Sequence, residues 1–196
     1  MTDYEEIEKY VLGKLKKELA PNLSYHGIHH TLAVLNSVEL IGKAEKVTDA
    51  EMILLKVAVL FHDVGFTIAY SNHEEAGCDM VRKDLPGYGF SQKDIDTICG
   101  MVMATKIPQK PSNKLEEIIA DADLEYLGTD NFEEIAATLY AEVKIYLNIE
   151  SERQWNIIQM NFLKGHHYFT DYCKKNREPS KQKHLKKIIK IVESYS

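Results

Sequence analysis

Apolar residues recur along this chain at the spacing of amphipathic helices. Residues three and four apart lie on one face of a helix, and the sequence repeats this spacing from one stretch to the next. Helices are predicted over residues 3–19, 24–46, 48–63, 72–85, 91–105 and 112–128, with three or four more after residue 130. No strand-like alternation persists beyond a few residues, so the predicted fold is all-α.

Capping signals and prolines mark several helix ends. Thr48 followed by Glu51 has the pattern of a capping box, and Ser91 begins another helix. The stretch 107–111 contains two prolines and is predicted to be a stiff loop, because each proline fixes φ and removes a hydrogen-bond donor.

The bulk composition indicates one helical domain over residues 1–196. With 44% apolar residues the chain can bury a sizeable core, and it has no apolar run long enough to span a membrane. The N-terminus is acidic and unlike a signal peptide. Three cysteines without a CxxC motif favour a reducing compartment, so a cytoplasmic protein is predicted.

The net charge of −6 is unevenly distributed. Residues 174–196 carry eight Lys or Arg and two acidic residues, a charge of +6, so the rest of the chain carries −12. We expect the basic tail to form a solvated helix that pairs with the acidic body. The acidity of that body argues against a nucleic-acid-binding protein.

A His-Asp pair ends the most apolar stretch of the sequence. Residues 54–61 are predicted to form a helix buried on nearly every face, and His62 and Asp63 follow directly. Polar groups there need partners other than bulk water. They either bind a cation together, or they are a hydrogen-bonded core histidine beside a helix-ending aspartate.

Four side chains form a candidate metal site. His30, His62, Asp63 and Asp123 each lie in or beside an apolar helical stretch. Two imidazoles and two carboxylates suit a divalent ion, and an octahedral ion would keep two positions for water and substrate. Such an ion lowers the pKa of bound water. Asp121 competes with Asp123 but points about 200° away on a helix, so we expect it to accept a hydrogen bond from a ligating imidazole or to face solvent.

Other polar residues are candidates for roles around this site. His26, one helical turn before His30, could protonate a leaving alkoxide or could be a solvent-exposed helix start. Lys106 and Gln109 could hold a phosphate. His73 and Glu74 could hold a water near the metal, although His73 could also simply cap a helix. His167 lies among aromatic residues, where a histidine more often packs than binds substrate.

The ordered pattern of His30, His62-Asp63 and Asp123 resembles the HD superfamily of metal-dependent phosphohydrolases. The resemblance covers residues 22–130 and implies a helical metal-binding core there, with residues 131–196 forming helices that pack on it. It also implies that these four residues bind the metal. The sequence Ala-Asp-Leu around Asp123 is similar to the last ligand of cyclic nucleotide phosphodiesterases, in which a histidine four residues before the first ligand, here His26, protonates the leaving group.

Residues 121–128 and 162–170 are similar to a bacterial group of predicted HD phosphohydrolases. In members with two metals, two further histidines follow the His-Asp pair. His73 could be the first, but residues 98–105 contain no histidine, so one metal ion is expected, of Mn, Mg, Fe, Co, Ni or Zn. Phe66 replaces a lysine that is frequent in cyclic-di-nucleotide and oxygenase members, which argues against both of those activities.

The predicted function is hydrolysis of a phosphomonoester or phosphodiester, of a nucleotide, by a metal-activated water. The first alternative is a sensor that binds a nucleotide in the same pocket without cleaving it. The second is an oxidative di-iron enzyme, which needs about six protein ligands. The sequence leaves the formation of a homo-oligomer open.

Overall fold

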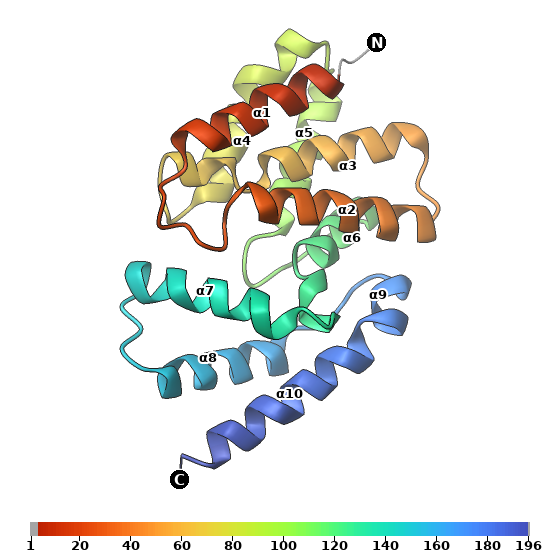
Figure 1. The fold of residues 1–196 in the computed structure, drawn as a ribbon. Helices are drawn as coiled ribbons and strands as arrows, with labels where there is room; N and C mark the ends of the chain where they lie inside the picture. Colours follow the sequence, from red (N-terminus) through yellow and green to blue (C-terminus); the bar gives the residue numbers. More distant parts are fainter. Residues whose placement is uncertain (1–3, 196) are drawn as a thin grey trace.

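A computed structural model describes residues 4–195 as an arrangement of helices (Figure 1). The α-helices are α1 (Tyr4–Glu18), α2 (Ile28–Ala44), α3 (Asp49–His62), α4 (His73–Asp84), α5 (Gln92–Ala104), α6 (Lys114–Asp123), α7 (Phe132–Tyr146), α8 (Glu152–Gly165), α9 (Asp171–Asn176) and α10 (Glu178–Glu193). Short 3-10 turns follow α3, α4 and α6: η1 (Val64–Thr67), η2 (Leu85–Tyr88) and η3 (Glu125–Gly128). The described residues contain no strand, which confirms the predicted all-α fold. None of these helices is both long and apolar enough to cross a bilayer.

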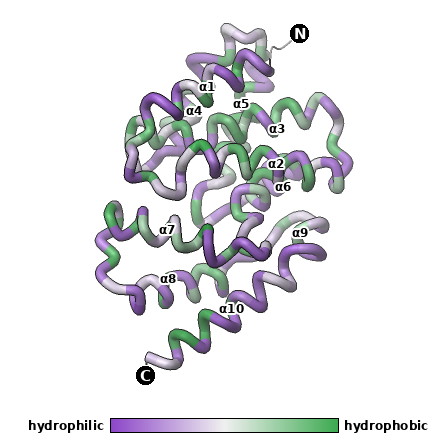
Figure 2. The backbone as a smooth tube through the Cα atoms, in the orientation of Figure 1, coloured by the Kyte–Doolittle hydropathy of each residue, from purple (hydrophilic) through white to green (hydrophobic). Residues whose placement is uncertain are grey.

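Helix α3 lies at the centre of the first half of the molecule. It packs against α1, α2, α4, α5 and α6, and its last six residues are all buried. Figure 2 shows α3 as one of the most hydrophobic segments of the backbone. The surrounding apolar core therefore holds His62, the last residue of α3, away from solvent.

A second apolar core joins the C-terminal helices. Buried residues of η3, α7, α8 and α10 form it, among them Leu127, Val143, Leu163 and Leu185. In Figure 1 helices α7, α8 and α10 lie below α1 to α6, and α10 runs along the lower edge of the molecule. The site described below lies where α7 meets the first half of the chain.

The capping boxes form as predicted. Thr48 accepts a hydrogen bond from the Glu51 backbone, and Ser91 accepts one from Asp94; in both pairs the acidic side chain bonds back to the cap. Two boundaries differ from the prediction. Helix α2 begins at Ile28 rather than near residue 24 or 26, because the backbone N–H groups of Tyr25 and His26 donate to Glu142 instead of entering the helix.

The helix predicted over 112–128 also ends early. It stops at Asp123, and Leu124 leaves the α conformation (φ −107°, ψ 15°) before the η3 turn. The buried Tyr168 hydroxyl lies 3.2 Å from the Leu124 carbonyl oxygen and 3.3 Å from that of Glu125, so these carbonyls have a partner outside the helix.

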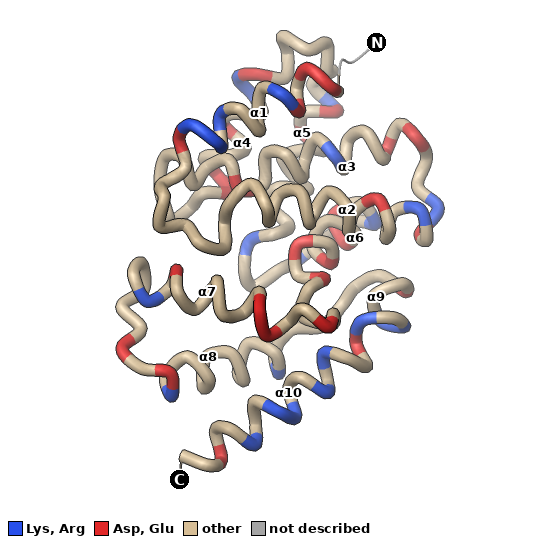
Figure 3. The backbone as a smooth tube through the Cα atoms, in the orientation of Figure 1, with Lys and Arg blue, Asp and Glu red and all other residues tan. Residues whose placement is uncertain are grey.

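Basic residues follow one another along α10 (Figure 3), and two basic side chains of residues 174–196 pair with acidic groups of the body. Lys187 of α10 pairs with Glu133 of α7 at 3.0 Å, and Arg177 pairs with Glu125. The exposed Lys187 pair adds little stability because water screens it. These contacts agree with the expected pairing of the basic tail with the acidic body.

Asp121 anchors the segment before α9. Its carboxylate is fully buried and accepts hydrogen bonds from the Phe169 N–H (2.9 Å), the Thr170 N–H (2.8 Å) and the Thr170 hydroxyl (2.6 Å). The expectation that Asp121 accepts from a ligating imidazole or faces solvent is wrong, because this segment folds back onto α6 and supplies all three donors.

Replacing Asp121 by alanine should lower the free energy of unfolding by about 3 kcal/mol, because three buried donors lose their acceptor. Urea denaturation measures the change. The matched control is Asp130→Ala, at an exposed position after η3, which should change stability by less than about 0.5 kcal/mol. Equal losses in the two variants would contradict this role of Asp121.

Candidate metal centre

Three predicted ligands converge at helix ends. His30 lies in the first turn of α2, His62 ends α3 and Asp123 ends α6. One ligand atom from each lies within 4.8 Å of the others. His30 Nε2 is 3.0 Å from Asp123 Oδ1 and 3.3 Å from His62 Nε2, so the two imidazoles and the carboxylate face one common point.

Asp63 brings a second carboxylate next to the two imidazoles. Its Oδ2 lies 3.1 Å from His62 Nε2 and 3.5 Å from His30 Nε2. This oxygen is buried and has no hydrogen-bond partner of suitable geometry among the described residues. We call His30, His62, Asp63 and Asp123 the His–Asp cluster.

The carboxylates of the His–Asp cluster are held in their ionised form. His62 Nδ1 lies 2.7 Å from the Val59 carbonyl oxygen and donates to it, which directs the other ring nitrogen, Nε2, into the cluster. Burial disfavours the charged form of Asp123, but its hydrogen bonds with His30 and His62 prevail and lower its pKa to about 2. The imidazolium form of His62 likewise outweighs burial and lowers the pKa of Asp63.

Two ionised carboxylates in a buried site need a compensating positive charge. Protons on the imidazoles can supply it, and so can a divalent ion. The Asp63 oxygen without a hydrogen bond and the donor set of two nitrogens and two oxygens fit a divalent cation of the first transition row or Mg²⁺.

The HD domain model matches residues 27–126, just over half of the chain, and this range contains all four residues of the His–Asp cluster. The chain belongs to the HD domain family. Members of this family are typically metal-dependent phosphohydrolases. The matched range includes the start of α2 and the ends of α3 and α6, where the four residues expected to bind the metal lie.

A solved structure has the same fold over nearly the whole chain. It is a predicted HD superfamily hydrolase from an uncultured Thermotogales bacterium, with a TM-score of 0.63 and 17% sequence identity. The match covers 98% of this chain and 92% of the other, so the likeness extends through the helices that follow the HD domain. Among the curated proteins, no sequence matches the chain significantly.

Glu142 is a site residue that the sequence analysis missed. It is fully buried on α7, and its Oε1 forms a short hydrogen bond with His26 Nδ1. Its other oxygen accepts from the backbone N–H groups of Tyr25 and His26 at 2.9 and 3.1 Å. The signal in the sequence was a glutamate three residues after Leu139, on the apolar face of its helix.

Glu142 fixes the position and charge of His26. Burial disfavours the charged imidazole, but the hydrogen bond with Glu142 and the nearby Asp63 carboxylate raise the pKa of His26. His26 precedes α2 instead of lying one turn before His30 within it, and the two ring centres are 6.0 Å apart. The His26 ring also stacks on the Phe66 ring, with the two ring centres 4.2 Å apart.

His73 and Glu74 lie beside Asp63 at the start of α4. His73 Nε2 is 3.8 Å from Asp63 Oδ1 and 3.4 Å from Glu74 Oε1. Gly65 permits this approach, because a Cβ there would come within 1.9 Å of the His73 carbonyl oxygen. The short η1 turn therefore allows the start of α4 to pack against the His–Asp cluster.

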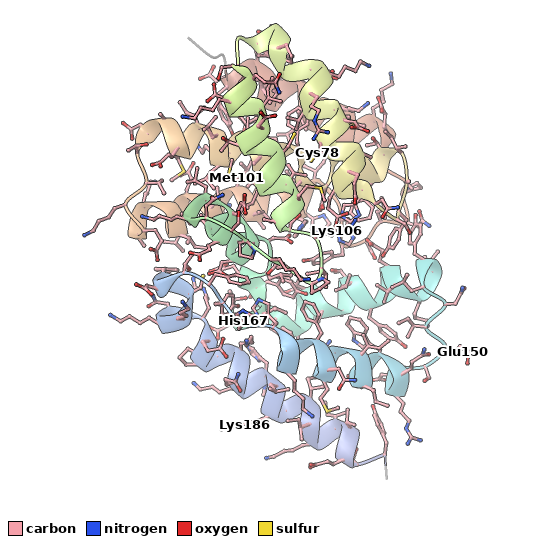
Figure 4. The ribbon with its side chains drawn as sticks, turned by 180° about the vertical axis from the view of Figure 1, so that it is seen from behind. Cys78, Met101, Lys106, Glu150, His167 and Lys186 are labelled. Carbon is pink, nitrogen blue, oxygen red and sulfur yellow. The ribbon has the colours of Figure 1, made fainter. Side chains whose placement is uncertain are left out.

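Three other predicted residues lie farther out. Lys106 forms an ion pair with Glu75 on α4, and Gln109 donates to the Ala120 carbonyl oxygen at 2.9 Å. His167 is exposed and has an edge contact with Phe169. Figure 4 shows Lys106 at the end of α5 and His167 in the neighbouring C-terminal part. None of the three contacts the His–Asp cluster.

Two cavities reach the His–Asp cluster. The central cleft, of about 250 Å³, is lined by residues that include Asp63, Asp123, His26, His73 and Glu74. The lateral cavity, of about 450 Å³, has Asp123 and His30 in its wall. Of these two cavities it is the central cleft that His26 lines, so the His26 imidazole and the proposed ligands face the same space.

The variant His62→Ala should bind Mn²⁺ at least about 100-fold more weakly than the wild type, because it removes one of the four ligands. Isothermal titration calorimetry of chelator-treated protein measures this affinity. His29→Ala, which removes the exposed neighbouring imidazole of His30, is the matched control and should keep wild-type affinity. Unchanged Mn²⁺ affinity in His62→Ala would exclude this metal centre.

Proposed function

We propose that this HD domain protein is a metal-dependent phosphohydrolase that cleaves a phosphomonoester or phosphodiester of a nucleotide. The observation that carries the proposal is the convergence of His30, His62 and Asp123 on one point. Asp63 Oδ2 lies 3.1 Å from His62 Nε2, is buried and has no hydrogen bond among the described residues. The similarity of Ala122-Asp123-Leu124 to the last ligand of cyclic nucleotide phosphodiesterases supports a nucleotide as substrate.

The His–Asp cluster would hold the divalent ion by two imidazole nitrogens and two carboxylate oxygens. Such an ion, when bound, polarises a phosphoryl group and lowers the pKa of water. The same ion would also offset the negative charge of Asp63, Asp123 and Glu74 around the central cleft. An anionic phosphoester could then enter a space that would otherwise repel it.

His26 has the properties of a general acid. Glu142 occupies its Nδ1, so Nε2 is the nitrogen left to donate a proton to the leaving oxygen. The raised pKa keeps His26 protonated closer to neutral pH, and the stacked Phe66 ring limits its rotation. Glu142 acts as a positioning residue, because it reaches the substrate only through His26.

Lys106 has no part in this proposal. Its ammonium group is neutralised by Glu75, and it lines a shallow surface pocket with Ile107, Pro108 and Lys110 instead of the central cleft. A phosphate-binding role would require it to leave Glu75.

The purified protein should release phosphate or a nucleotide product from at least one member of a phosphoester panel in the presence of Mn²⁺, Mg²⁺, Co²⁺ or Ni²⁺. Asp63→Ala should lower kcat/KM by at least about 1,000-fold, because it removes a ligand and a charge from the site. Asp79→Ala, on the exposed side of α4, is the control and should keep full activity.

Full turnover by Asp63→Ala would disprove the proposal. Nucleotide binding without any product, under every metal, would favour the alternative of a nucleotide sensor that uses the same pocket.

Glu142→Gln should lower kcat about 10- to 100-fold and move the alkaline limb of the kcat/KM profile to lower pH. The sign follows from the proton: Glu142 raises the pKa of His26, so removing its charge lets His26 lose the proton at lower pH. Glu133→Gln, on the exposed face of the same helix, should leave the profile unchanged. A lower kcat with an unshifted profile would mean that Glu142 only stabilises the fold.

A further inference from the structure

A third cavity lies next to the central cleft, and the proposed function gives it no role. This distal cavity, of about 300 Å³, is walled by the loop after α5 and by the end of α8 and the segment that follows it. It shares Ile107 and Phe162 with the central cleft. Its volume is at the lower end of the range for small-molecule sites.

Gln109 offers an unused acceptor to the distal cavity. Its Nε2 donates to the Ala120 carbonyl oxygen at 2.9 Å, and this bond fixes the orientation of the amide. The other end, Oε1, is buried and has no hydrogen-bond partner among the described residues. An unpartnered buried carbonyl is costly, and because no described residue donates to this oxygen, a bound ligand or an ordered water is left to do so.

His166 offers an unused donor in the same wall. The Lys181 ammonium lies 3.2 Å from its Nδ1 and also donates to its backbone oxygen at 2.6 Å. A lysine ammonium only donates, so Nδ1 accepts and Nε2 carries the hydrogen. Burial and the Lys181 charge lower the pKa of His166 to about 4, which keeps the ring neutral. Nε2 is buried and, within residues 4–195, has no partner.

The remaining walls are mainly apolar or aromatic, with Asn161 and His167 as the other polar side chains. Phe162 and Phe169 line the cavity with Ile107 and Pro108, and none of its lining residues is acidic, lysine or arginine. The distal cavity therefore suits an uncharged, flat group that presents one donor and one acceptor. The edge of a nucleobase has this pattern, and its face stacks on aromatic rings.

We propose that the distal cavity binds the nucleobase of the substrate, with Gln109 Oε1 accepting from the base and His166 Nε2 donating to it. This inference rests on the proposed function, since it assigns the base to the distal cavity and the phosphate to the His–Asp cluster. The shared residues Ile107 and Phe162 would lie beside the sugar that joins them. Gln109 thus contacts the base rather than the phosphate.

Free nucleosides test the distal cavity separately from the metal chemistry. Calorimetric titration of the full chain with adenosine, guanosine, cytidine and uridine should give saturable binding of at least one, whereas ribose 5-phosphate should not compete with it in metal-free buffer. Gln109→Met should weaken the nucleoside about tenfold, the value of one hydrogen bond. Gln92→Met, at an exposed helix start, is the matched control and should bind like the wild type.

A second measurement uses the wild-type protein, so its result does not depend on whether the Gln109→Met variant folds. Long-range ¹H–¹⁵N spectra should show His166 protonated at Nε2, and saturation with the bound nucleoside should shift this resonance while leaving that of the distant, exposed His29 in place. Asp63→Ala should still bind the nucleoside, because the distal cavity does not include Asp63.

The outcomes separate the two proposals. Nucleoside binding without turnover of any phosphoester would retain the base site and reject the phosphohydrolase. The base site is overturned if none of the four nucleosides binds, or if a bound nucleoside neither shifts the His166 resonance nor loses affinity in Gln109→Met. In that case the two unpartnered atoms are satisfied by ordered water alone.

Discussion

Two carboxylates and two imidazoles share one buried point in this protein, and most of the surrounding structure serves to hold them there. Like charges in a low-dielectric site repel strongly, and carboxylates removed from water lose their hydration. His30 and His62 lie within about 3.6 Å of the oxygens of Asp63 and Asp123, and they lower the pKa of both carboxyl groups. A divalent ion would provide the same compensation more completely than protons, and it would engage the Asp63 oxygen that lacks a hydrogen bond.

The helical architecture supplies this geometry because helices end at the site. A side chain within a buried helix has its surroundings filled by neighbouring residues, whereas at a helix end the chain turns and leaves room for a ligand. His62 ends α3 and Asp123 ends α6, and α2 begins just before His30. Glu142 of α7 contacts His26, so the residues after the HD domain also form part of the surroundings of the site.

Local patterns in the sequence account for most of the fold. The apolar run of α3 and the capping box at Thr48 determine a helix without reference to distant residues. The same patterns could not place Glu142 against His26, because 116 residues separate them and their contact depends on how α7 packs. The predicted role of Asp121 is wrong for the same reason, since the hydrogen-bond donors to its carboxylate come from residues 169 and 170. Ordered His and Asp residues suggested the His–Asp cluster, but the distances among their atoms required the structure.

A crystal of the protein grown or soaked with Mn²⁺ tests the central claim most directly, because anomalous scattering locates the ion itself. The account predicts one strong peak at roughly 2.0–2.3 Å from nitrogen atoms of His30 and His62 and from carboxylate oxygens of Asp63 and Asp123. A fully loaded crystal with no peak between these four side chains, or with the ion bound elsewhere, would contradict it.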